Sequence, residues 1–125
     1  SPYINFNKKN NIKNHILFDI DWQGAKKLRK QFKTDQILDF FILPPNKNEL
    51  KRRLKRRGSD DKEQINIRLS HALLEMQHYT DYKYVLINDN ILETVKNLLS
   101  IINFNLFIDN INLNVNKKLN IIINK

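Results

Sequence analysis

The stretch ILDFFILPPNKNELKRRLKRRG, residues 37–58, decides the fold expected for this chain. Its first seven residues are an almost unbroken apolar run, which is typical of a β-strand buried on both faces, and we expect that strand over 37–43. Pro44 and Pro45 end it, because proline lacks the N–H group that a strand ladder needs. The stretch therefore predicts a strand followed at once by a different element.

That next element is a helix over 48–57. Asn46 is a good N-cap, because its side chain can accept a hydrogen bond from a free N–H group of the first turn. Leu50 and Leu54 lie four residues apart on the inner face, and Gly58 ends the helix. Six cations crowd around the two leucines.

The same alternation continues outward in both directions. Upstream, HILFDI (15–20) predicts a second buried strand, and QGAKKLRKQF (23–32) has the period of a helix. Downstream, YVLIN (84–88) predicts a third strand, and ILETVKNLLSII (91–102) a final amphipathic helix. Repeated alternation of strands and helices indicates an α/β fold with a parallel sheet.

A further helix lies between the basic helix and the third strand. Asp60 and Glu63 form a loose capping pair at its start. Its apolar residues recur at helical spacing and predict one face packed on the body. They are Ile65, Leu69, Ala72, Leu73 and Met76.

Composition limits the possible classes. The 125 residues, 41% of them hydrophobic, suffice for one domain, and the absence of cysteine excludes disulfides, thiol catalysis and cysteine zinc sites. No apolar run approaches the roughly 18 to 20 residues needed to cross a bilayer, and no signal-peptide pattern is present, so we expect a soluble, cytoplasmic protein without a membrane segment. The net charge of +9 suits an anionic partner, although Asn, Lys and Ile recur throughout the chain and part of this charge is background.

Candidate site residues follow the predicted strands. In parallel sheets ligands bind at the carboxyl ends of the strands. Asp19 and Asp21 follow the first strand, the basic helix follows the second, and Asn88 and Asp89 follow the third. Acids at strand ends together with arginines on a movable helix are the groups that phosphoryl transfer requires.

Five segments of the chain, in matching order and spacing, resemble the carboxyl-terminal part of bacterial guanylate kinase. The resemblance runs from Leu17 to about Ile102, and it rests on DIDWQGA (19–25), FILPP (41–45), ELKRRLKRRG (49–58), INIRLSHALLEMQHY (65–79) and VLIND (85–89). It implies a P-loop-kinase-like parallel sheet with flanking helices. That fold is incomplete here, because the 125 residues contain no phosphate loop of the type GxxxxGK[ST]. It also implies transfer of the γ-phosphoryl group of ATP to GMP, with Mg²⁺.

The resemblance also implies roles for single residues. Asp19 matches the acid near Mg²⁺ and GMP, with an indirect contact to the metal, and Asp21 matches a second acid on the GMP side. Three arginines match residues that approach the transferring phosphates: Arg53, Arg57 and Arg68. Asn88 and Asp89 match the loop beside the adenine of ATP.

The chain divides into three parts on this reading: a poorly matching segment over 1–14, a partial guanylate-kinase-like core over 15–102 with a lid at about 46–68, and an Asn-rich tail over 103–125 that is helical or frayed. We expect the chain to be inactive alone. A non-catalytic family module or decayed remnant is the alternative, and a basic nucleic-acid-binding domain ranks third. The oligomeric state stays open.

Each site residue also has a purely structural interpretation. The strand-end acids could cap a helix, and the Asn-Asp pair could turn the chain. Three cations of the basic run are expected to form a solvated helix face: Lys51, Arg52 and Lys55. Trp22 is expected to serve packing, and the three scattered histidines are expected to serve packing or to lie on the surface.

Overall fold

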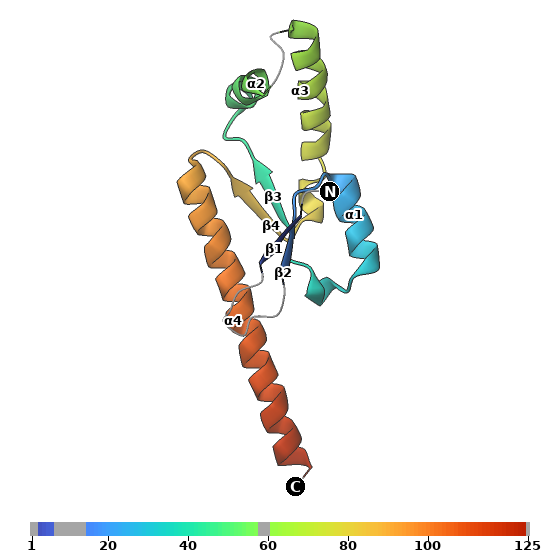
Figure 1. Ribbon diagram of the computed structural model, residues 1–125, viewed down its shortest axis with the longest axis vertical. Helices are drawn as coiled ribbons and strands as arrows, with labels where there is room; N and C mark the ends of the chain where they lie inside the picture. The colour runs from blue at the N-terminus through green and yellow to red at the C-terminus, as the bar shows by residue number, and fades with distance from the viewer. Residues whose placement is uncertain (1–2, 7–14, 58–60, 125) are drawn as a thin grey trace.

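The computed structural model describes residues 3–6, 15–57 and 61–124. Within these ranges the chain forms an α/β structure with two small sheets (Figure 1). Its strands are β1 (Tyr3–Phe6), β2 (His15–Phe18), β3 (Phe40–Leu43) and β4 (Tyr84–Ile87). Its helices are α1 (Trp22–Gln31), α2 (Lys47–Arg56), α3 (Lys62–Met76) and α4 (Ile91–Ile123), with short 3₁₀ turns η1 (Thr34–Gln36) and η2 (Tyr79–Asp81).

The strands β3 and β4 form the expected parallel pair. Phe40 lies beside Tyr84 at one end of the pair, and Leu43 lies beside Ile87 at the other. The N–H group of Asn88 donates to the carbonyl oxygen of Leu43 at 2.7 Å, which extends the ladder by one residue. The carboxyl ends of both strands therefore meet at one edge of the sheet.

The strand β2 differs from the expectation in two ways. It pairs antiparallel with β1, in a register that sets Tyr3 beside Phe18, instead of joining the parallel sheet. All four of its residues are exposed, with Ile16 at 54%, so the expected burial on both faces is wrong. A strand is buried on both faces only when layers cover both sides of its sheet, and this two-stranded sheet lacks such layers among the described residues.

Side-chain caps set the starts of the helices. The side chain of Asn46 accepts a hydrogen bond from the N–H group of Glu49 at 2.8 Å, which confirms the predicted cap of α2. The cap of α3 is Asp61, whose side chain accepts from the N–H group of Glu63, because that helix begins at Lys62. The expected pairing used Asp60, which lies outside the described residues.

The core is small. Among the described residues, its buried apolar members are Ala25, Phe41, Ile65 and Leu69. The apolar face of α3 is thus partly as predicted, whereas Leu73 is 37% exposed. The helix α1 is tied to the sheet by Arg29, which donates from Nε to the Asp39 carboxylate at 2.9 Å.

Two aromatic contacts add to the packing of α1. The ring of Trp22 stacks on His78 at a centroid distance of 3.8 Å, in agreement with the packing role expected for Trp22. The guanidinium group of Arg29 lies over the ring of Tyr82. Burial raises the pKa of the Tyr82 hydroxyl above its ordinary value, and the nearby Arg29 opposes this.

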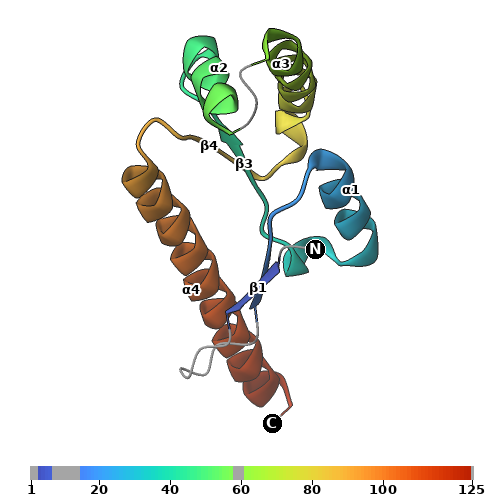
Figure 2. The same ribbon diagram turned by 45° about the horizontal axis from the view of Figure 1, so that its top comes forward.

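The helix α4 is far longer than predicted, because the Asn-rich tail continues it without a break. Figure 2 shows its carboxyl-terminal part extending past the strands, and most of its apolar side chains there are exposed, as with Phe104 at 59% and Ile122 at 62%. By length and composition α4 could cross a membrane, whereas no membrane segment was expected. The core helices of soluble proteins can have the same length and composition.

Candidate functional site: an arginine cavity beside the end of β4

An open cavity of about 560 Å³ lies between α2 and the turn that joins β4 to α4. Four arginines and two carboxylates line it, so its charge is positive. The lining residues are Glu49, Arg52, Arg53, Arg56, Arg57, Asn88, Asp89 and Ile91. A positive hollow at the carboxyl end of a parallel strand is the place where α/β folds bind anionic ligands.

The local structure of α2 explains why its arginines face this cavity. Leu50 and Leu54 are partly buried, and α2 packs against α3. Residues three and four apart share a helix face, so Arg53, Arg56 and Arg57 form one basic face. Arg57 follows the helix as its C-cap and is exposed.

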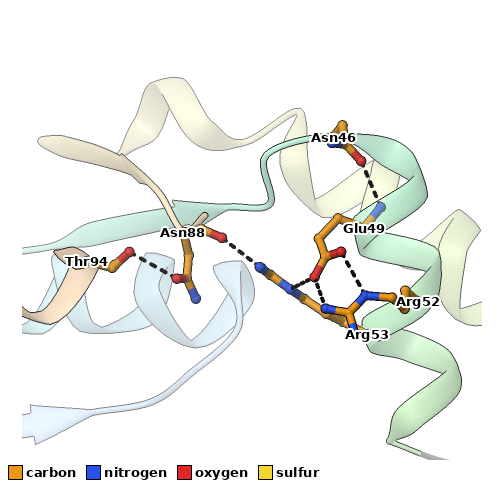
Figure 3. A network of polar contacts seen from close by, with 6 residues as sticks. All are labelled: Asn46, Glu49, Arg52, Arg53, Asn88 and Thr94. Carbon is orange, nitrogen blue, oxygen red and sulfur yellow. Dashed lines mark hydrogen bonds and ion pairs between the residues drawn. The ribbon is translucent and has the colours of Figure 1, made fainter. Parts of the chain in front are cut away.

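Glu49 joins two of these arginines (Figure 3). Its Oε2 atom accepts from Nε of Arg52 at 2.8 Å, and its Oε1 atom accepts from Nε of Arg53 at 3.0 Å and from Nη2 of Arg52. These contacts, first of all the hydrogen bond from Arg52, lower the pKa of Glu49 from 4.5 to about 2. The same pairing raises the pKa of Arg52. The carboxylate is therefore ionised at every physiological pH.

Asn88 links the cavity to the sheet. Its backbone carbonyl oxygen accepts from Nη2 of Arg53 at 2.8 Å, and its side-chain Oδ1 atom accepts from Thr94 Oγ1 at 3.0 Å. The Thr94 hydroxyl group shares its one hydrogen with the carbonyl oxygen of Asn90 at 2.9 Å, and Thr94 is the one buried polar residue in the described part of the chain. The network in Figure 3 thus runs from the start of α4 through the end of β4 to α2.

The structure brings four of the predicted site residues together: Arg53, Arg57, Asn88 and Asp89 all line the cavity. Arg68 is partly buried on α3 and does not line it, nor do the two predicted acids. Asp21 caps α1 by accepting from the N–H group of Gly24 at 2.9 Å, and Asp19 is exposed beside it.

Sequence reasoning missed part of the cavity. Glu49 was not singled out, although a glutamate three and four residues before two arginines is a recognisable ion-pair signal on a helix. Arg52 was assigned to a solvated face. Its side chain is indeed 55% exposed, but it pairs with Glu49 and lines the cavity. Arg56 also lines it, without an ion-pair partner among the described residues.

Comparison with known proteins supplies the context for this geometry. The family described as "Guanylate kinase" matches residues 4–105. The chain is 49% identical over 87 residues to the guanylate kinase of Baumannia cicadellinicola, covering 70% of this chain and 42% of that protein. It is 47% identical over 87 residues to that of Haemophilus influenzae, covering 70% and 41%. The chain therefore spans about two fifths of the length of these relatives.

A solved structure agrees with the sequence matches. The guanylate kinase of Anaplasma phagocytophilum superposes with a TM-score of 0.54 at 33% identity, covering 67% of this chain and 37% of that one. This likeness confirms the expected α/β fold of the P-loop-kinase type, with parallel strands, flanking helices and only part of the family's sheet. The chain belongs to the guanylate kinase family.

Proposed function

We propose that this protein acts in guanylate kinase catalysis, transferring the γ-phosphoryl group of ATP to GMP to give ADP and GDP. The observation that carries the proposal is the cavity in which three arginines of α2 and its C-cap Arg57 meet the carboxyl end of β4, in a chain of this family. Phosphoryl transfer is catalysed mainly by positioning and by stabilising negative charge, and guanidinium groups supply both.

Arg53 and Arg57 have complementary parts in this proposal. Arg53 is held at Nε by Glu49 and at Nη2 by the carbonyl oxygen of Asn88, so its remaining N–H groups are fixed in direction. Donors fixed before the reaction stabilise developing charge at little cost in reorganisation. Arg57, exposed at the end of α2, would close over the phosphates together with the lid. Arg68 would approach them only through such a movement of α2 and α3.

The two acids after β2 serve the GMP side in this proposal. Asp21 uses Oδ1 to cap α1, which leaves Oδ2 for an acceptor role toward GMP. Asp19 is an exposed carboxylate, and the described residues contain no cluster of three potential metal ligands. A single carboxylate such as that of Asp19 fits Mg²⁺, because this ion binds through one or two carboxylates, water and substrate phosphates. Bound there, Mg²⁺ would neutralise phosphate charge.

Asn88 and Asp89 serve the adenine side of ATP in this proposal. The Oδ1 atom of Asn88 is engaged by Thr94, so the Nδ2 amide group is the donor that remains for a base. Asp89 is exposed and supplies an acceptor. The substrates are then ATP and GMP, and the cytoplasm, where these nucleotides occur, is the proposed location. A non-catalytic family module is a second candidate, favoured by the exposed apolar side chains of α4.

A coupled assay for ADP release tests the proposal. The chain is mixed with a polypeptide comprising the amino-terminal part of the Haemophilus influenzae relative, which would supply a phosphate loop. We expect ADP release that depends on GMP and on both polypeptides, and that Arg57→Ala abolishes. GMP-independent release would show that the phosphoryl group is transferred to water and not to GMP, which would contradict the proposal. No release from a pair shown to associate would favour the non-catalytic module.

A further inference from the structure

The position of Glu49 among the arginines raises a question that the proposed function does not answer. One carboxylate lies between two guanidinium groups and accepts from Nε of both. Its side chain is only 21% exposed. Charge-assisted hydrogen bonds of this kind also hold phosphate oxygens, because carboxylate and phosphate present similar acceptors to a guanidinium fork. Glu49 therefore uses the donors that a phosphoryl group would need.

We infer that Glu49 is a specificity-determining residue of the cavity, because its carboxylate competes with phosphoryl groups for Arg52 and Arg53 and so selects polyphosphates over single phosphate groups. The inference rests on the proposed function in one respect, namely that the cavity takes phosphoryl groups. Beyond that function, the cavity discriminates between single phosphate groups and polyphosphates, and Glu49 causes this discrimination.

The physical argument is one of competing charges. A single phosphate carries at most about two negative charges at neutral pH, and placed beside Glu49 it meets repulsion from a carboxylate that is already paired. A polyphosphate carries more charge and spans a longer distance. It can contact Arg56 and Arg57, which have no ion-pair partner among the described residues, while it displaces or bypasses Glu49. The longer anion therefore gains contacts that the shorter anion lacks.

The alternative is that Glu49 only orients Arg53 for its ligand. The two roles predict opposite effects when the carboxylate is removed. If Glu49 competes, its loss frees donors and strengthens the binding of phosphate. If it only orients Arg53, its loss releases the guanidinium group and weakens the binding of every anion.

The test is isothermal titration of the chain with inorganic phosphate and with tripolyphosphate, at constant ionic strength. We expect Glu49→Gln to bind phosphate about tenfold more tightly than the wild type, and to discriminate less between the two anions. Glu63→Gln is the matched control, because it changes the net charge equally on an exposed residue outside the cavity. Glu49→Ala provides a second variant without the carboxylate should Glu49→Gln fold poorly.

Weaker binding of both anions by Glu49→Gln, or a change equal to that of Glu63→Gln, would overturn the inference. The result is separable from the assay with ATP and GMP. Reduced discrimination without any GMP-dependent ADP release would leave a polyphosphate-selective cavity in a protein that is not a kinase. GMP-dependent release with unchanged discrimination would leave the kinase and remove the role of Glu49.

Discussion

Arg53 donates a hydrogen bond from Nη2 to the backbone carbonyl oxygen of Asn88 at 2.8 Å, across 35 positions of the chain. This contact ties the basic helix α2 to the end of β4, where the parallel pair stops. The arginines of α2 are thus held beside the sheet edge by a hydrogen bond to the main chain. A substitution of the Asn88 side chain would not directly remove this hydrogen bond.

Replacing Arg53 with lysine should loosen this attachment. A single ammonium group cannot keep both the Glu49 contact and the Asn88 contact in the geometry of the guanidinium fork. We expect a loss of about 1–2 kcal/mol in the free energy of unfolding, measured in urea. Arg56→Lys, at a position of the same helix that has no ion-pair partner among the described residues, should stay within about 0.5 kcal/mol. Equal effects of the two substitutions would show that the Asn88 contact is weak in solution.

Arg57 and Lys51 should separate catalysis from stability. In the two-polypeptide assay, Arg57→Ala should lower turnover by roughly 10³-fold or more, as arginines that stabilise transferring phosphoryl groups do. Because Arg57 is exposed, unfolding should change by no more than about 0.5 kcal/mol. Lys51→Ala, on the same helix but outside the cavity lining, should be nearly silent. Two equally mild substitutions would mean that the basic run is only a solvated face.

The pH dependence of stability should contain a component from Glu49. Its pKa of about 2 in the folded chain lies below the ordinary value of 4.5, so its ion pairs with Arg52 and Arg53 stabilise the fold above pH 4.5. That stabilisation is lost as the pH falls toward 2. The melting temperature of the wild type should therefore exceed that of Glu49→Gln at pH 7, and this difference should close near pH 2. A difference independent of pH would contradict the ion pairing.

Among the acidic residues of the described fold, Asp39 should lower the free energy of unfolding most when it is substituted. Its Oδ1 atom accepts from the N–H group of Lys83, and its Oδ2 atom accepts from Arg29, so one partly buried carboxylate joins β3, β4 and α1. Asp39→Asn should cost about 1–3 kcal/mol in urea unfolding. Asp35→Asn, at an exposed position in η1, is the control and should change little. A similar loss in both would exclude a special role for Asp39.

The 125 residues alone should not turn over ATP and GMP at a useful rate. They contain no GxxxxGK[ST] loop, whose amides and lysine hold the β- and γ-phosphates in line for attack. Arginines cannot replace that positioning. The purified chain with GMP should release no ADP above background in the coupled assay. Turnover near one per second would show that these residues suffice.

Local signals in the sequence predicted most of the local structure. Asn46 caps its helix as expected, and the apolar runs of β3 and β4 form strands, because caps and periodicity depend on neighbours within one turn or one strand. These two strands pair in parallel, as the alternation of strands and helices predicted. The environment of β2 could not be predicted in this way. An apolar strand such as Ile16–Phe18 implies covering layers, but periodicity does not state whether those layers are present.

The site was predictable to the extent that it depends on strand ends. Arg53 and Asn88 were both expected near phosphates or nucleotide, and they are in contact, because parallel strands place their carboxyl ends at one edge. The contact itself could not be read from the sequence, since it joins a side chain to a distant carbonyl group. Glu49 could have been found from its spacing to Arg52 alone.

The binding preference of the chain tests the central claim, that the arginine cavity is a nucleotide phosphate site, most directly. The measurement is a thermal-shift titration with ATP and Mg²⁺, compared with a random-sequence oligonucleotide at several salt concentrations. We predict stabilisation by ATP that Arg53→Ala and Arg57→Ala remove, and weaker stabilisation by the oligonucleotide at moderate salt. Tight oligonucleotide binding with a steep salt dependence, and no effect of ATP, would contradict the account.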